Sequence, residues 1–95
     1  MHDLTGFQRD LLYVIAGSEK PHGLAVKDEL EEYYETDINH GRLYPNLDTL
    51  VDKGLVEKGD KDRRTNFYTL TRRGRREIED RAEWEAQYSE EIVPA

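Results

Sequence analysis

Apolar residues recur at intervals of three and four along the first third of this 95-residue chain, which is the spacing of one face of a helix. The first such stretch starts after Thr5, which forms a capping-box pattern with Gln8, and stops at Gly17. Turn-forming residues occupy 18–23, and a second amphipathic stretch with outward glutamates runs over 24–35. The pattern therefore predicts two helices joined by a short turn.

A third helix is the best-defined element of the sequence. Asn39 can cap it, and it runs to Lys53, where Gly54 stops it. Its apolar stripe consists of Leu43, Leu47, Leu50 and Val51. Pro45 lies inside this helix, where it removes one hydrogen bond and crowds the carbonyl of Gly41. The proline is either a tolerated kink or part of a specialised surface, at which Gly41 lets a phosphate come close.

The segment after the third helix has the alternation of a two-stranded hairpin. Residues 55–58 alternate weakly between apolar and polar, residues 59–64 are turn-like, and residues 66–70 alternate again. Three helices, a hairpin and a further helix have the order of a winged helix-turn-helix. The predicted fold is mainly α with a small β-hairpin, that is, a winged helix-turn-helix over 1–70 followed by a C-terminal dimerisation helix and tail over 71–95.

The last helix is predicted to start at the cap Thr71 and to reach about Glu91, with Gly74 as a weak point. Its large apolar residues lie on one ridge, formed by Trp84, Tyr88 and Ile92. Such a ridge is too large to leave in water on a small protein. We expect it to pack on a second copy of the chain, helped by Phe7 and Leu11 of the first helix. The alternative is that the ridge folds back onto its own domain.

Charge is distributed very unevenly along the chain. The segment from Asp60 to Arg76 carries seven Lys or Arg and two Asp, a local charge of +5, while the whole chain has a formal net charge of −7. A basic stripe on an acidic protein indicates a polyanionic partner. The acidic remainder is typical both of proteins from very salty cytoplasm and of ordinary acidic proteins, and composition does not separate the two.

The third helix has a second face that can read DNA. On a helical wheel it lies away from the leucine stripe, and it is formed by Arg42, Asn46, Thr49 and Lys53. Arg and Asn match the edges of guanine and adenine in the major groove, whereas a merely solvated helix face is the alternative. Asp48 and Asp52 flank this face and would repel phosphates. The hydroxyl of Tyr44 can contact a phosphate, or its ring can belong to the core.

Several short motifs resemble the PadR family of winged-helix transcriptional regulators, in particular its members from halophilic archaea. The matching residues span roughly 7–92 and include HGRLYPNL at 40–47, GLV at 54–56, FY at 67–68, LT at 70–71, and the glycines at 23 and 74. The sequence LYP within a helix is distinctive because proline is unfavourable there.

The resemblance implies a homodimer that binds pseudo-palindromic promoter DNA, with the third helix in the major groove and the hairpin near the minor groove. The residues that would take these roles are Asn39, Arg42, Tyr44, Asn46 and Thr49 on the helix and Lys61, Arg63 and Arg64 on the hairpin. The last helix begins with four arginines, at positions 72, 73, 75 and 76, which cannot all face one surface. We expect some of them, in particular Arg72, to contact phosphates and the others to pair with nearby acids. Salt cations held by acidic residues are a further expected partner at the DNA interface.

Enzymatic and metal-binding classes are not expected. The histidines at 2, 22 and 40 have no metal-ligand spacing, and the chain has no cysteine for thiolate chemistry. No nucleophilic triad order or Gly-rich phosphate loop occurs, so we expect no cofactor. No apolar run approaches the roughly 20 residues of a membrane span, which favours a cytoplasmic protein. A winged helix used as a protein-interaction module is the alternative to a DNA-binding regulator.

Overall fold

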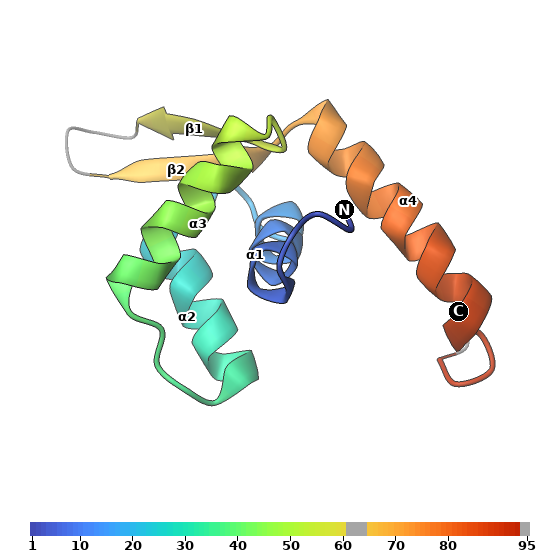
Figure 1. Ribbon diagram of the computed structural model, residues 1–95. Coiled ribbons are helices and arrows are strands. Elements are labelled where there is room, and N and C mark those ends of the chain that lie inside the picture. The colour runs from blue at the N-terminus through green and yellow to red at the C-terminus, as the bar shows by residue number, and fades with distance from the viewer. Residues whose placement is uncertain (61–64, 94–95) are drawn as a thin grey trace.

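The computed structural model describes residues 1–60 and 65–93 and confirms the predicted winged helix-turn-helix with a small hairpin and a last helix. Four helices and a two-stranded antiparallel hairpin form a winged helix (Figure 1). In chain order the elements are α1 Gly6–Ala16, α2 Gly23–Tyr34, α3 His40–Asp52, β1 Val56–Asp60, β2 Asn66–Leu70 and α4 Arg72–Ser89. Within the described residues, no helix combines the length and the apolar character needed to cross a membrane.

The core lies where α1, α2, α3 and the hairpin meet. The side chains with no exposed surface include Leu11, Leu12, Val26, Leu43, Leu47 and Leu50. The aromatic ring of Tyr68 closes the core from the hairpin side, with 1% of its surface exposed. Burial raises the pKa of the Tyr68 hydroxyl to about 12. The apolar stripes predicted for the first three helices therefore converge on one interior.

Local caps explain where the helices begin and end. The hydroxyl of Thr5 accepts a hydrogen bond from the backbone N–H of Gln8, and the side chain of Gln8 accepts one from the backbone N–H of Thr5, which completes the predicted capping box. Asn39 Oδ1 accepts from the N–H of Arg42 at 2.8 Å. Gly54, which follows α3, has φ of +75°, a conformation that side-chain-bearing residues rarely adopt.

The hairpin differs from the sequence prediction in the length of its first strand. Gly59 and Asp60, predicted to lie in the tip, continue β1 and pair with Phe67 and Asn66. The Phe67 ring lies so close to Gly59 that a Cβ there would be 2.8 Å from a ring carbon. Because glycine has no side chain, the strand can pass under the ring and remain paired.

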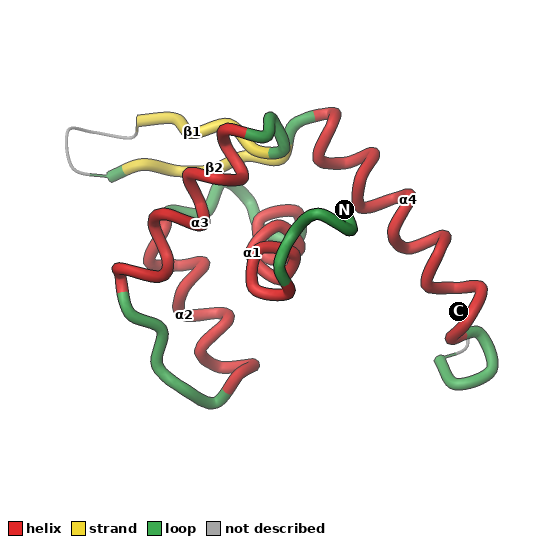
Figure 2. The backbone as a smooth tube through the Cα atoms, viewed as in Figure 1, coloured by secondary structure: helices red, strands yellow, loops and turns green. Residues whose placement is uncertain are grey.

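The turn before α2 and the N-terminal loop connect elements that are distant in the sequence. Tyr68 N–H donates to the carbonyl of Pro21, which ties β2 to the turn between α1 and α2. Figure 2 shows the N-terminal loop running from α1 toward α4. Helix α4 leaves the hairpin and extends away from the other helices, and it ends at Ser89 rather than near Glu91.

Gly74 is a site of close packing rather than the weak point that was predicted. It is the buried residue of α4, and a Cβ built on it would lie 2.2 Å from the carbonyl oxygen of Leu55 and 2.7 Å from a methyl carbon of Leu70. The backbone of Leu55 cannot give way cheaply, since Leu55 O accepts from Thr71 N–H. The missing side chain therefore allows α4 to start directly against the hairpin.

We predict that Gly74→Ala lowers the free energy of unfolding by about 2–3 kcal/mol, because the added methyl overlaps backbone atoms. Gly6→Ala is the matched control, since its Cβ would meet nothing nearer than 4.0 Å. Urea denaturation at one fixed protein concentration measures both variants. If Gly74→Ala were as stable as the parent, the close contact with Leu55 would not restrict the side chain at position 74.

Candidate nucleic-acid interface

Helix α3 presents a surface on the side away from its buried leucines. The exposed residues of this helix include Gly41, Arg42, Tyr44, Pro45, Asp48 and Asp52, and Asn46, Thr49 and Lys53 at its end are partly exposed. The four residues predicted to form a reading face are thus at the surface. Arg42, Asn46 and Lys53 also contact the N-terminal part of the chain, which helical periodicity did not show.

Asn46 is held by hydrogen bonds at both ends of its amide. Its Nδ2 donates to the carbonyl oxygen of Arg42 at 2.7 Å, and its Oδ1 accepts from Gln8 Nε2 of α1 at 2.8 Å. Thr49, on the next turn, donates its hydroxyl to the carbonyl of Pro45 at 3.0 Å. The side chains of this face are therefore oriented before any ligand arrives.

Arg42 lies over an aromatic ring of α1. Its guanidinium carbon is 4.0 Å from the centroid of Phe7, a cation–π contact, and the ring of Tyr34 is 6.4 Å from that of Phe7. The Tyr34 hydroxyl donates to the carboxylate of Asp10. Burial and this hydrogen bond raise the pKa of the Tyr34 hydroxyl to about 12, so it stays protonated at neutral pH. Arg42 thus remains exposed while its side chain rests on a fixed aromatic platform.

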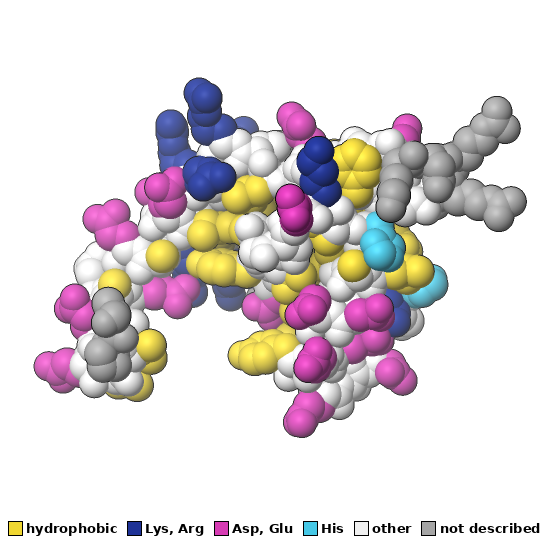
Figure 3. All heavy atoms as spheres, turned by 180° about the vertical axis from the view of Figure 1, so that it is seen from behind, with side chains coloured by type: hydrophobic (Ala, Val, Ile, Leu, Met, Phe, Trp, Pro, Cys, Tyr) yellow, Lys and Arg dark blue, Asp and Glu magenta, His cyan; other side chains and the backbone are white. Residues whose placement is uncertain are grey.

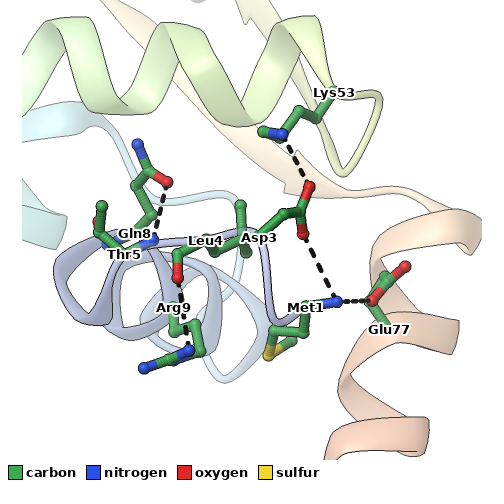
Figure 4. A network of polar contacts seen from close by, with 8 residues as sticks. All are labelled: Met1, Asp3, Leu4, Thr5, Gln8, Arg9, Lys53 and Glu77. Atoms are coloured by element: carbon green, nitrogen blue, oxygen red, sulfur yellow. Dashed lines mark hydrogen bonds and ion pairs between the residues drawn. The ribbon is translucent and has the colours of Figure 1, made fainter.

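A chain of ion pairs connects the end of α3 to α4 through the N-terminus (Figure 4). Lys53 Nζ is 2.8 Å from Asp3 Oδ2, the ammonium of Met1 is 3.7 Å from Asp3 Oδ1, and it is 2.7 Å from Glu77 Oε2. The hydrogen bond from Lys53 lowers the pKa of Asp3 below its ordinary value. The pair is therefore intact at neutral pH and is lost as the pH falls through that lowered pKa.

The residues that sequence reasoning missed are all near the N-terminus. Asp3, Phe7 and Gln8 contact the predicted reading face at Lys53, Arg42 and Asn46 respectively. Gln8 had been recognised as half of a capping box, but its free amide nitrogen carried no sign of a distant partner. These contacts connect residues separated by 35 or more positions, which no local pattern reveals.

Tyr44 does not belong to the core, which was one of its two predicted alternatives. Its side chain is 36% exposed, while its ring packs on the backbone of Gly23 and makes an edge contact with His40 at 5.8 Å. On the same surface, Lys58 of β1 lies 3.7 Å from the carboxylate of Asp48. The hairpin and α3 therefore form one continuous surface. The side-chain oxygen of Asn39, the N-cap of α3, accepts the hydrogen bond from Arg42 N–H.

Basic side chains gather where α4 begins. Lys61, Arg63 and Arg64 lie outside the described residues. Arginines 72, 73, 75 and 76 are all exposed, and none of them forms an ion pair with any residue in 1–60 or 65–93. The predicted pairing of some of them with Glu77, Glu79 or Asp80 is therefore not seen among these residues, and Glu77 instead pairs with the Met1 ammonium. Figure 3 shows Lys and Arg gathered at this end and Asp and Glu over other parts of the molecule.

The predicted dimer residues fall into two groups. Trp84 and Tyr88 lie on the outer part of α4 with 50% and 71% of their surfaces exposed, and their rings are 5.2 Å apart. Ile92 is 80% exposed but follows the end of the helix instead of continuing its ridge. Phe7 and Leu11, by contrast, are buried in the core of the single chain at 7% and 0%, so they leave no free surface for a partner.

Over the part of the chain that the structure describes, no three His, Cys, Asp or Glu residues are arranged to hold a metal ion.

Comparison with known proteins identifies relatives for almost the whole fold. The Transcriptional regulator PadR-like family matches residues 11–80. RosR of H. salinarum, a halophilic archaeon, is 54% identical, with a TM-score of 0.86 over 98% of this chain and 82% of that protein. A complex structure designated RosR-S1 gives 54% identity and a TM-score of 0.89 over 94% of this chain and 79% of that one.

More distant structures share the fold alone. F93 from STIV, a winged-helix DNA-binding protein, is 19% identical with a TM-score of 0.71, over 97% of this chain and 98% of that one. No curated protein matches the chain. The predicted resemblance to halophilic members is thus confirmed, and the family is one of non-enzymatic DNA-binding proteins. This chain belongs to the PadR-like family of winged-helix transcriptional regulators.

Proposed function

We propose that the chain acts as a homodimer that binds pseudo-palindromic promoter DNA and regulates transcription by blocking or recruiting the polymerase. Residues 1–70 serve as the DNA-binding part and residues 71–95 as the dimerisation part, and the protein works in the cytoplasm. The observation that carries this proposal is the surface of α3, on which the exposed Arg42 and the partly exposed Asn46 are already oriented by fixed contacts. Preorganised polar side chains on a protruding helix suit base reading in the major groove.

Base reading and backbone binding fall on different elements. On α3, Arg42 and Asn46 read base edges, while Asn39, Tyr44, Thr49 and Lys53 position the helix. Phosphate contacts come from the exposed arginines that begin α4, represented by Arg72, and from the basic residues between the two strands, which are Lys61, Arg63 and Arg64. The four arginines at the start of α4 make no ion pair within the described residues. No internal ion pair must therefore break before they meet a phosphate.

The outer part of α4 supplies the surface for the second copy. The rings of Trp84 and Tyr88 stand next to each other on an arm that extends from the domain, with Ile92 and Val93 exposed beyond it. Tyr13 of α1, at 39% exposure, lines a groove between α1 and α4 together with Ala82 and Ala86. It is the α1 residue that we propose for the interface instead of the buried Phe7 and Leu11. A two-fold axis through this arm would put two copies of α3 about 34 Å apart, in successive major grooves.

Cations are proposed as partners at the DNA surface. Asp48 and Asp52 are exposed on α3, and among the described residues only Asp48 of the two forms an ion pair, with Lys58 at 3.7 Å. Carboxylates facing phosphates would take up cations on binding, which offsets the counterions that Lys and Arg release. The similarity to RosR, from a halophilic archaeon, supports this adaptation.

We predict that Trp84→Ala weakens the dimer by about 30-fold or more, because it removes an aromatic anchor from the interface. Tyr33→Ala is the control, since Tyr33 is 76% exposed on α2, away from α4. Sedimentation at micromolar concentration compares the two variants with the parent. If the parent itself is monomeric, the dimer proposal is wrong.

We predict that Arg42→Ala and Asn46→Ala each lose about 1–3 kcal/mol of binding to a selected duplex and bind random duplex almost normally. Arg72→Ala should weaken both by similar factors, because a phosphate contact is independent of sequence. Titration of labelled duplexes measures the two affinities. Equal losses on both duplexes for the α3 variants would remove these residues from the reading role, and no binding to any duplex would favour a protein-interaction module.

We predict that affinity for the selected duplex falls far less between ~0.1 M and ~1 M KCl than five or more phosphate contacts would imply. Asp48→Asn combined with Asp52→Asn should steepen the decline, because cation uptake is removed. Glu29→Gln combined with Glu32→Gln, on the exposed face of α2, is the control with the same change of charge. A steep decline for the parent would reject the role of cations.

A further inference from the structure

Two side-chain amides stand in series between two main-chain groups at the junction of α1 and α3. Thr5 N–H donates to Gln8 Oε1 at 3.1 Å, Gln8 Nε2 donates to Asn46 Oδ1 at 2.8 Å, and Asn46 Nδ2 donates to the carbonyl oxygen of Arg42 at 2.7 Å. In Figure 4 the amide oxygen of Gln8 faces Thr5 while its nitrogen points toward α3. The relay therefore links the first turn of α1 to a turn of the helix that reads DNA.

The ends of this relay determine how both amides are oriented. A backbone N–H can only donate and a backbone carbonyl can only accept, so the chemical character of Thr5 N–H and Arg42 C=O is fixed. Turning either amide around would place an oxygen against an oxygen or an N–H against an N–H at both of its contacts. Asn46 thus holds its oxygen on the side of Gln8 and its nitrogen on the side of the Arg42 carbonyl.

Asn46 keeps hydrogen-bonding capacity for a ligand. One N–H of Nδ2 and one lone pair of Oδ1 remain after the two internal bonds, and the side chain is partly exposed. Adenine offers one acceptor, N7, and one donor, the N6 amino group, on its major-groove edge. An amide with fixed polarity meets that pair in one direction only, which separates A·T from T·A as well as from G·C.

We propose that Gln8 is a positioning residue for recognition of an operator adenine, and that it acts by fixing the amide of Asn46. This inference rests on the proposed reading role of α3. Gln8 does not itself contact the base; it holds the group that does. Its effect therefore falls on sequence discrimination rather than on overall attraction to DNA.

The residue type at position 8 agrees with this role better than with capping alone. Glutamate completes a capping box as well as glutamine does, because the cap needs only an acceptor for Thr5 N–H. The link to Asn46 needs a donor, which glutamate lacks at neutral pH. A carboxylate at position 8 would place a second oxygen next to Asn46 Oδ1, so only glutamine serves both contacts.

The test uses duplexes that the parent protein selects from a random pool. Two quantities are measured for each variant: the base preference at each position, and the ratio of the affinity for a selected duplex to that for a random duplex. Asn46→Ala should lower this ratio by about 5- to 100-fold. Gln8→Met, which removes the relay without adding charge, should lower it by about threefold to tenfold, the value of one hydrogen bond. Both variants should lose the same adenine preference.

Thr5→Ala is the matched control. It removes the hydroxyl that accepts from Gln8 N–H, and so weakens the α1 cap, but it leaves the bonds of the Gln8 side chain to Thr5 N–H and to Asn46 in place. Its adenine preference and affinity ratio should equal those of the parent. Gln8→Glu keeps the cap and provides the same test if Gln8→Met does not fold. Its added charge lowers the affinities for selected and for random duplex alike, so that this effect cancels in the ratio of the two.

The outcomes separate the two proposals. If Asn46→Ala changes neither ratio nor preference, the reading role of Asn46 is wrong and the inference falls with it. If Asn46→Ala removes the preference while Gln8→Met keeps it, only the inference is overturned. A double variant completes the cycle, because Gln8→Met should have no further effect on the ratio in the Asn46→Ala background. An equal effect in both backgrounds would show that Gln8 does not act through Asn46.

Discussion

The burial of α1 among the other elements is the constraint on which the rest of the structure depends. Its residues Leu11, Leu12 and Ile15 are buried, and the helix contacts α2, α3, β2 and α4. A chain of this size has room for one interior, and α1 occupies the middle of it. Each side of α1 therefore determines something different. One side forms the core, the first turn holds the proposed reading surface of α3, and Tyr13 faces the groove beside α4.

The sequence predicted those features that arise from neighbouring residues. Caps at Thr5, Asn39 and Thr71 and the leucine stripe of α3 depend on contacts within a few positions, so periodicity and residue type reveal them. The same holds for Gly54 as a stop. The family resemblance added the winged-helix arrangement, which local patterns alone suggest only as an order of elements.

Features that depend on distant contacts were predicted poorly. A helical wheel shows which face of α3 avoids its own leucines, but not that Phe7 and Gln8 lie along that face. Likewise Phe7 is a reasonable surface anchor by sequence, yet it is buried because α3 and α2 cover it. The low helix propensity of glycine led to the prediction that Gly74 is a weak point. The backbone of Leu55, 19 positions earlier, restricts the size of the residue at this position.

The close approach at Gly74 fixes the angle at which α4 leaves the hairpin, and a small change of this angle moves the far end of the helix a long way. The helix is 18 residues long, which corresponds to about 27 Å, and it is supported mainly at its first turns. A tilt of about 10° at that end would move the far end by roughly 5 Å. In the proposed dimer the far end is where the two copies meet. A single hydrogen atom in place of a methyl group would thus help to set the geometry with which two reading helices face their operator.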